Sequence, residues 1–240
     1  MRRWGAAVAA SAAVVLALTG CSSGAHSRLL AGAAAFYGNQ RVSAAQLSVQ
    51  VANLNAAYQV AKARVQPQYR PAEMPAKVLT WLLRFATVDQ AAARARPRIT
   101  VTPHEAQMAL AAEAVTLRQS GDTLVEAAVL SGLPPDMLPQ LGRWIAIQNK
   151  LVVRLDNGAS PTSTAGQQAL LAALGHRECL AAKSLDILVN PQYGAFDYGT
   201  SGLSSQTQVV LVPSRLAAAP GGPLVGRAPG TPKPRLTPPC

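Results

Sequence analysis

The stretch Ala33-Ala34-Ala35-Phe36-Tyr37-Gly38-Asn39-Gln40-Arg41-Val42-Ser43 contains two short extended runs on either side of a turn. Gly38-Asn39 is a turn pair between them, so the stretch predicts a small β-hairpin. Ser43 stands three residues before Gln46, which is the spacing of a capping box, in which the hydroxyl and the amide cover free N–H groups at a helix start. The stretch therefore predicts a hairpin that leads directly into a helix.

Most of the remaining chain has the pattern of helices. Apolar residues recur at spacings of three and four, and start and stop signals mark the ends. The patterns predict helices over 43–65 (ended by Pro67 and Pro71), 76–94, 102–119, 122–131, 134–155 and 163–184, and then a short strand over 185–189. The composition is 49% apolar but only 5% aromatic, which favours an Ala-rich helical protein over a β-sandwich. The expected fold class is mainly α.

The first twenty residues have the pattern of a secretion signal. Basic Arg2-Arg3 precedes an apolar run from Gly5 to Leu18, which is too short to span a bilayer comfortably. Leu18-Thr19-Gly20-Cys21 follows and resembles the lipobox of bacterial lipoproteins, in which the Cys thiol takes a diacylglyceryl group. Residues 1–20 are thus predicted to be a lipoprotein signal peptide, Cys21 the lipidation site and 21–32 a tether. The protein is expected at the extracytoplasmic face of the cell membrane, held by its acyl chains.

Three features of the following chain occur together. They are the strand-turn segment before the capped helix, the helix start over 99–105 within an all-helical middle, and the closing Val189-Asn190-Pro191-Gln192-Tyr193-Gly194 with Phe196-Asp197 behind it. Together they resemble the N-terminal chaperone module of SurA-type periplasmic foldases over about residues 30–200. The resemblance implies a helical domain, taken as 33–212, whose first extended run pairs with the segment near the closing motif. It also implies binding of unfolded or exported polypeptides.

The chain departs from this family in ways that affect function. Gln192 stands where the family often has Arg, and the parvulin isomerase domain has no room between Leu155 and Asn190. The histidines His26, His104 and His176 are no candidates for a parvulin active site. Isomerase activity is therefore not carried over, and the protein is expected not to be an enzyme.

Other functional classes lack their sequence signals. There is no GxxxxGKS, GxGxxG, CxxC or HExxH motif, so neither a cofactor nor a metal site is expected. The net charge is +11, but the basic residues are accompanied neither by aromatic residues that could stack on bases nor by a recognition helix. This argues against nucleic acid as a partner. Residues 213–240 are rich in Pro and Gly and contain no acidic residue, and they are predicted to be a disordered basic tail.

Several residues have two interpretations that the sequence leaves open. His176 and Cys179 form a reactive thiolate–imidazole pair, or Cys179 is a half-buried structural residue. Cys179 also either forms a disulfide with Cys240 or leaves it free. The aromatic residues Tyr193 and Phe196, and likewise Trp81 and Trp144, either pack the fold or line a binding surface. Met74, Met108 and Met137 could add soft contacts to an apolar groove. The peptide-binding residues stay unassigned.

Two functions follow as hypotheses. The first is a membrane-anchored extracytoplasmic lipoprotein that acts as a non-catalytic chaperone for exported or unfolded polypeptides. The second is a structural or adaptor lipoprotein that holds one cell-envelope protein. The number of distinct partners would distinguish them.

Overall fold

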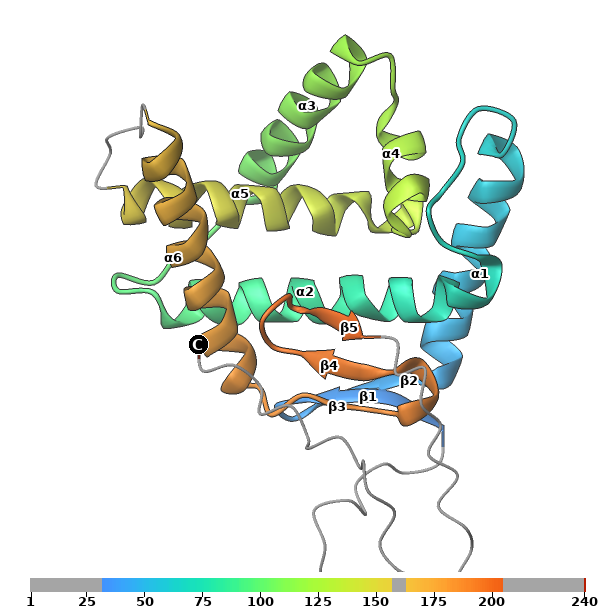
Figure 1. Ribbon diagram of the computed structural model, residues 1–240, viewed down its shortest axis with the longest axis horizontal. Coiled ribbons are helices and arrows are strands. Elements are labelled where there is room, and N and C mark those ends of the chain that lie inside the picture. Colours follow the sequence, from blue (N-terminus) through green and yellow to red (C-terminus); the bar gives the residue numbers. More distant parts are fainter. Residues whose placement is uncertain (1–31, 157–162, 205–239) are drawn as a thin grey trace, which may run out of the picture.

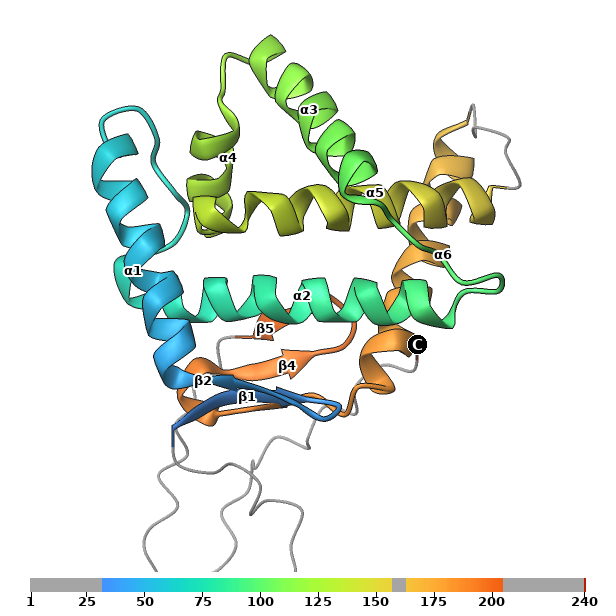
Figure 2. The same ribbon diagram turned by 180° about the vertical axis from the view of Figure 1, so that it is seen from behind.

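The computed structural model describes residues 32–156, 163–204 and 240, and it is mainly helical, as predicted. Helix α2 (Met74–Arg94) runs across the middle of the molecule (Figure 1). Helix α5 (Leu138–Leu155) lies beside it, while α1 (Ala44–Ala61) and α6 (Thr164–Lys183) cross near its two ends. Helices α3 (Pro103–Gln119) and α4 (Leu124–Ser131) lie on the far side of α5 (Figure 2).

The helix starts form as their local sequence predicts. Ser43 and Gln46 make a reciprocal capping box at α1, and Thr102 and Glu105 make another at α3. Each box satisfies N–H groups that have no partner within the helix. At the end of α4, Gly132 adopts the left-handed conformation (φ 76°), which glycine reaches without strain. These local signals explain why most predicted helix boundaries agree with the observed ones.

The predicted pairing between the N-terminal and closing segments is present. Strand β1 (Ala33–Tyr37) lies between β2 (Gln40–Ser43) and β3 (Leu188–Val189), and both pairings are antiparallel. Asn190 extends this contact, because its backbone N–H donates to the Ala34 carbonyl (2.9 Å) and its side-chain amide donates to the Ala33 carbonyl (3.1 Å). The Asn190 side chain also accepts from the Gln192 N–H (3.2 Å), which starts the next turn. The closing motif therefore joins the two ends of the helical body.

A second hairpin follows, which the sequence patterns did not predict. Strands β4 (Ala195–Asp197) and β5 (Gly202–Ser204) pair antiparallel, and the side chain of Asp197 accepts hydrogen bonds from Gly199 and Thr200 in the turn. Gly194 enters this hairpin at φ 108°, and a Cβ atom there would lie 2.5 Å from the Ser204 carbonyl oxygen. The hairpin lies along α2 (Figure 1).

Helix α2 is central because it contributes residues to three apolar clusters of the core. One apolar cluster joins Val78, Leu79 and Leu83 of α2 to α1, β1 and β2, and a second joins Val88 and its neighbours to α5 and α6. A third surrounds Trp81, with residues of α4 and of the turn before α5. A helix that contacts neighbours on several sides must be apolar around much of its circumference, as the sequence of α2 is.

Some predicted boundaries differ from the observed ones. Helix α1 ends at Ala61 and not at Val65, and the chain continues in a turn in which the Arg64 N–H donates to the Ala61 carbonyl only three residues back. Strand β3 is shorter than the predicted 185–189, because Asp186 turns the chain at φ 47° between α6 and the strand. The loop over 157–161, most of the signal and tether residues and the tail up to residue 239 lie outside the described residues, as do residues 205–212 of the predicted domain.

Candidate functional site

A groove runs between the first half of α2 and the closing segment. Its floor and one wall come from α2 and from the short 3-10 helix before it, η2 (Pro71–Glu73). The other wall comes from the 3-10 turn η4 (Pro191–Tyr193) and from the β4–β5 hairpin. The groove holds about 580 Å³, within the usual range for ligand sites. It exists because Asn190 and Gly194 direct the closing segment back against α2.

The groove combines aromatic and polar surface. Trp81, Tyr193 and Leu203 provide apolar area, whereas Lys77, Thr80 and Gln192 provide polar groups. Such a mixture suits a polypeptide segment, which presents a polar backbone together with side chains of both kinds.

Trp81 is the best-anchored aromatic residue of the groove. Only 8% of its surface is exposed, and its indole N–H donates to the Ser131 carbonyl (3.1 Å). Its ring meets Trp144 edge to face at 5.9 Å between centroids, and the Arg84 guanidinium lies 5.4 Å from the Trp81 ring centroid. These contacts fix the ring and bring a cation to its surface.

A smaller pocket of about 260 Å³ adjoins the groove. Arg84 and Thr200 line both spaces, so the two are neighbours. This smaller space, called the inner pocket below, is also lined by Thr87 of α2, Trp144 of α5, Glu178 of α6 and Ser201 of the β4–β5 turn. Arg84 Nε donates to the Ser201 carbonyl (3.2 Å), which ties the hairpin turn to α2.

Two charged groups of this pocket are partly removed from water. Burial lowers the pKa of Arg84, although Glu178 counteracts this effect. Burial also raises the pKa of Glu178, although the hydrogen bond from Gln148 Nε2 (2.7 Å) and the charge of Arg84 act in the opposite direction. Burial therefore disfavours the charged form of both groups, and the charge of each partly offsets this effect for the other.

We expect Glu178→Gln to raise the melting temperature at pH 7. The raised pKa means that folding favours the protonated, uncharged carboxyl group, so the cost of the charge is present above the folded pKa and vanishes below the unfolded one. Gln is uncharged at every pH and keeps an oxygen that accepts from Gln148. The gain should therefore shrink towards pH 4 when both proteins are melted in parallel. An equal gain at both pH values would show that the charge of Glu178 is not its cause.

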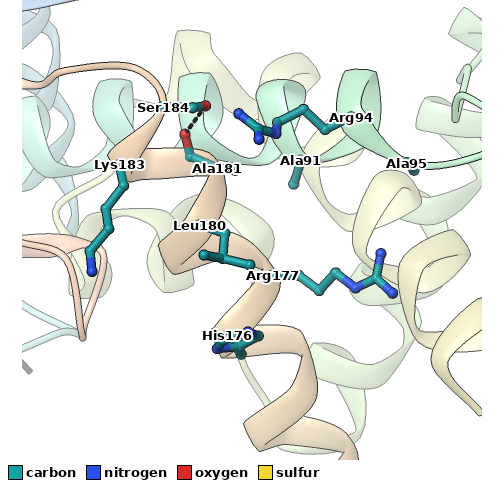
Figure 3. Close-up of a pocket in the computed structure, with 9 residues that line it drawn as sticks. All are labelled: Ala91, Arg94, Ala95, His176, Arg177, Leu180, Ala181, Lys183 and Ser184. Carbon is teal, nitrogen blue, oxygen red and sulfur yellow. Dashed lines mark hydrogen bonds between the residues drawn. The ribbon is translucent and has the colours of Figure 1, made fainter. Parts of the chain in front are cut away.

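Two further hollows have different chemistry. One, of about 250 Å³, lies between α3, α4 and α5 and is mainly apolar, with Trp81, Leu141 and Trp144 in its lining. The other, of about 660 Å³, lies between the end of α2 and the second half of α6 (Figure 3). Its lining is basic, with Arg94, Arg177 and Lys183, and these three side chains are exposed to solvent.

The structure separates the residues that the sequence singled out. Tyr193 lines the groove, whereas Phe196 packs edge to face on Tyr198 (5.1 Å between centroids) beside the main core. Trp81 is both a core residue and a groove wall, and Trp144 lines the inner pocket. Of the methionines, Met74 and Met137 are buried in the core and Met108 is 58% exposed on α3. Cys21 lies outside the described residues.

The interpretation of Cys179 as a structural residue agrees with the structure. Cys179 is buried and forms a disulfide with Cys240, with the two Cα atoms 5.7 Å apart. A bonded sulfur provides no thiolate for His176, so the reactive-pair hypothesis is wrong for this state of the protein. The last residue of the predicted disordered tail is thus attached to α6.

Sequence reasoning missed Arg84, Thr87 and Glu178. Arg84 and Thr87 follow the apolar run of α2 around Leu82 and Leu83 at a spacing of three, which places them on one face. Because this helix is expected to be buried, its polar residues were the signal that could have indicated a pocket. Glu178 had no such signal, because its neighbours His176 and Arg177 make that part of α6 resemble a solvated surface.

Comparison of the chain with protein-family models, with curated proteins and with solved structures finds no match. The resemblance to SurA-type foldases therefore stays a prediction. Among the described residues, no helix is long and apolar enough to cross a membrane, and no group of His, Cys, Asp and Glu could hold a metal ion.

Proposed function

We propose that this protein is a lipid-anchored extracytoplasmic chaperone that binds segments of exported or unfolded polypeptides without catalysis. The groove between α2 and the closing segment supports the binding part of the proposal. It joins apolar rings to polar side chains within about 580 Å³. The lipobox-like stretch Leu18-Thr19-Gly20-Cys21 supports the anchored location.

The groove has features of a site that accepts many sequences. Trp81 is 8% exposed and held by fixed contacts, so the part of its ring that lines the groove is preformed, at little entropic cost on binding. Gln192 is exposed at the opposite wall and provides a donor and an acceptor for backbone groups. A preformed apolar surface with polar rims recognises general features of a chain and few specific ones.

The test is binding of fluorescently labelled, unstructured peptides, measured by anisotropy. Ala72→Tyr should weaken binding at least tenfold, because Ala72 lines the groove and a tyrosine ring there would occupy it. Ala111→Tyr is the matched control, since Ala111 is exposed on α3 and does not line the groove. Equal weakening by both variants, or by neither, would contradict the groove as the site.

Two activity measurements complete the test. The protein should suppress aggregation of several unfolded clients and should leave prolyl isomerisation at its uncatalysed rate, which is tens of seconds or slower. Binding of one folded envelope protein with no effect on unfolded clients would favour the adaptor function instead.

A further inference from the structure

We propose that the surface where the ends of α2 and α5 meet α6 binds the anionic phospholipid headgroups of the membrane that holds the predicted anchor. This surface, called the basic surface below, consists of five exposed cationic side chains: Arg94, Arg96, Arg154, Arg177 and Lys183. The inference rests on the anchored location in the proposed function, and it adds a second contact with the same membrane.

Two neighbouring hollows bring these cations together from three separate parts of the chain. The larger one, of about 660 Å³, has Arg94, Arg177 and Lys183 in its lining. The smaller one, of about 120 Å³, has Arg96, Arg154 and Arg177 in its lining. Because Arg177 lines both hollows, the basic surface is continuous. The guanidinium of Arg154 also donates to the Pro97 carbonyl, which ties the end of α5 to the loop after α2.

The basic surface has no anionic partner in the part of the chain that the structure describes. No acidic residue lines either hollow, and the nearby Glu178 lines the inner pocket instead. The cations that form ion pairs within the described ranges are Arg64, Arg70, Arg143 and Lys150. Five like charges gathered without a counter-charge repel one another and attract an anionic partner.

The directions of the side chains favour an extended anionic surface over one small anion. In Figure 3, Arg94, Arg177 and Lys183 point in different directions around Leu180. A single small anion is held best by donors that converge on it. Diverging cations can each face a different headgroup of a membrane. Leu180 is 45% exposed among them and offers an apolar contact at the membrane interface.

The length of the tether allows this contact. Eleven residues, 22–32, follow the predicted anchor Cys21 up to the first described residue, and they span at most about 40 Å when extended. Strand β1 then leads to Gly38, whose N–H donates to the carbonyl of Leu185, two residues after Lys183. The six residues from Gly32 to Gly38 cover about 20 Å, so the tether is long enough to let the basic surface reach the membrane.

The experiment measures binding of the unacylated protein to vesicles by co-sedimentation. It uses residues 22–240 with the disulfide intact, which include every described residue and carry no acyl chain. The vesicles contain phosphatidylcholine alone, or phosphatidylglycerol and phosphatidylcholine at about one to three. At about 0.05 M salt, the mixed vesicles should bind the protein at least about tenfold more tightly, and about 0.5 M salt should remove most of this difference.

A pair of double variants locates the contact. Arg94→Gln with Arg177→Gln should weaken binding to the mixed vesicles by about 25-fold, because each cation near an anionic membrane contributes about fivefold. Lys62→Gln with Arg118→Gln makes the same change in net charge at the ends of α1 and α3, and neither residue lines these hollows. This control should bind within about twofold of the wild type, since membrane attraction falls off over about 10 Å. All four side chains are exposed, so both variants should melt as the wild type does.

Two soluble anions test other occupants of the basic surface. Inorganic phosphate should displace no more protein from the mixed vesicles than sodium chloride does at the same ionic strength. Greater displacement by phosphate would indicate a site for one small anion and would overturn the proposal. Binding of polyglutamate that depends on Arg94 and Arg177, without binding to the mixed vesicles, would assign the surface to an acidic polypeptide and would also overturn it.

The remaining outcomes separate this inference from the proposed function. Equal binding to both kinds of vesicle, or equal weakening by the two double variants, would overturn the basic surface as a membrane contact. Neither result would affect the groove, which the anisotropy measurements test. The lipid anchor is tested separately by fractionation of a Cys21 variant, so failure of the anchor and failure of the basic surface are distinguishable.

Discussion

Replacing Cys21 with alanine should move the protein almost completely from the membrane fraction to the soluble extracytoplasmic fraction. The predicted anchor depends on the thiol of this residue, and each buried methylene of an acyl chain contributes about 0.8 kcal/mol to membrane binding. Several chains together hold a protein stably, and none can attach to an alanine side chain. The measurement is fractionation of cells followed by immunoblotting.

The matched control is Ser22→Ala, which changes the next residue and keeps the thiol. This control should fractionate with the membrane as the wild type does. Retention of the Cys21 variant in membranes at the same processed length would contradict the lipobox assignment, because another feature would then hold the protein there.

Loss of the Cys179–Cys240 disulfide should lower stability by about 2–4 kcal/mol, which corresponds to a fall in melting temperature of about 5–15 °C. The bond joins residues 61 positions apart and so removes many conformations from the unfolded chain. Cys240→Ala, melted by circular dichroism under non-reducing conditions, measures the effect. Wild type in a reducing agent should melt like the variant.

Deletion of residues 213–240 separates the disulfide from other contributions of the tail. This segment lacks a buried apolar pattern in the sequence, so its deletion should cost as much as Cys240→Ala and no more. In a Cys179→Ala background, the deletion should have almost no effect. A further fall of more than about 4 °C there would show that the tail packs on the domain through other contacts.

The elements that the sequence predicted best depend on neighbouring residues. The capping boxes at Ser43 and Thr102 act over three residues, and the Gly38-Asn39 turn acts over two. Their geometry is decided within one turn of the chain. For the same reason Gly132 correctly marked the end of α4.

The pairing of β1 with β3 spans more than 150 residues, and it was predicted only through the resemblance to a known family. Its physical basis is visible in Asn190, whose amide reaches the Ala33 carbonyl. No local pattern contains that information.

The β4–β5 hairpin and the inner pocket could not be predicted in the same way. The strands have only three residues each, which is too short for an alternating pattern to stand out. The pocket brings Thr87, Trp144 and Glu178 together from three helices, and Ser201 from the hairpin. Which residues meet there depends on the packing of α2, α5 and α6, and sequence periodicity specifies only which face each helix buries.

The most direct test of polypeptide binding in the groove is site-specific photocrosslinking in intact cells. A photoreactive amino acid is placed at Gln192, which is exposed on the groove wall, and, as a control, at Gln107, which is exposed on α3 away from the groove. We expect position 192 to crosslink many different exported polypeptides and position 107 to crosslink few. No crosslinks at position 192, or the same set of partners at both positions, would contradict it.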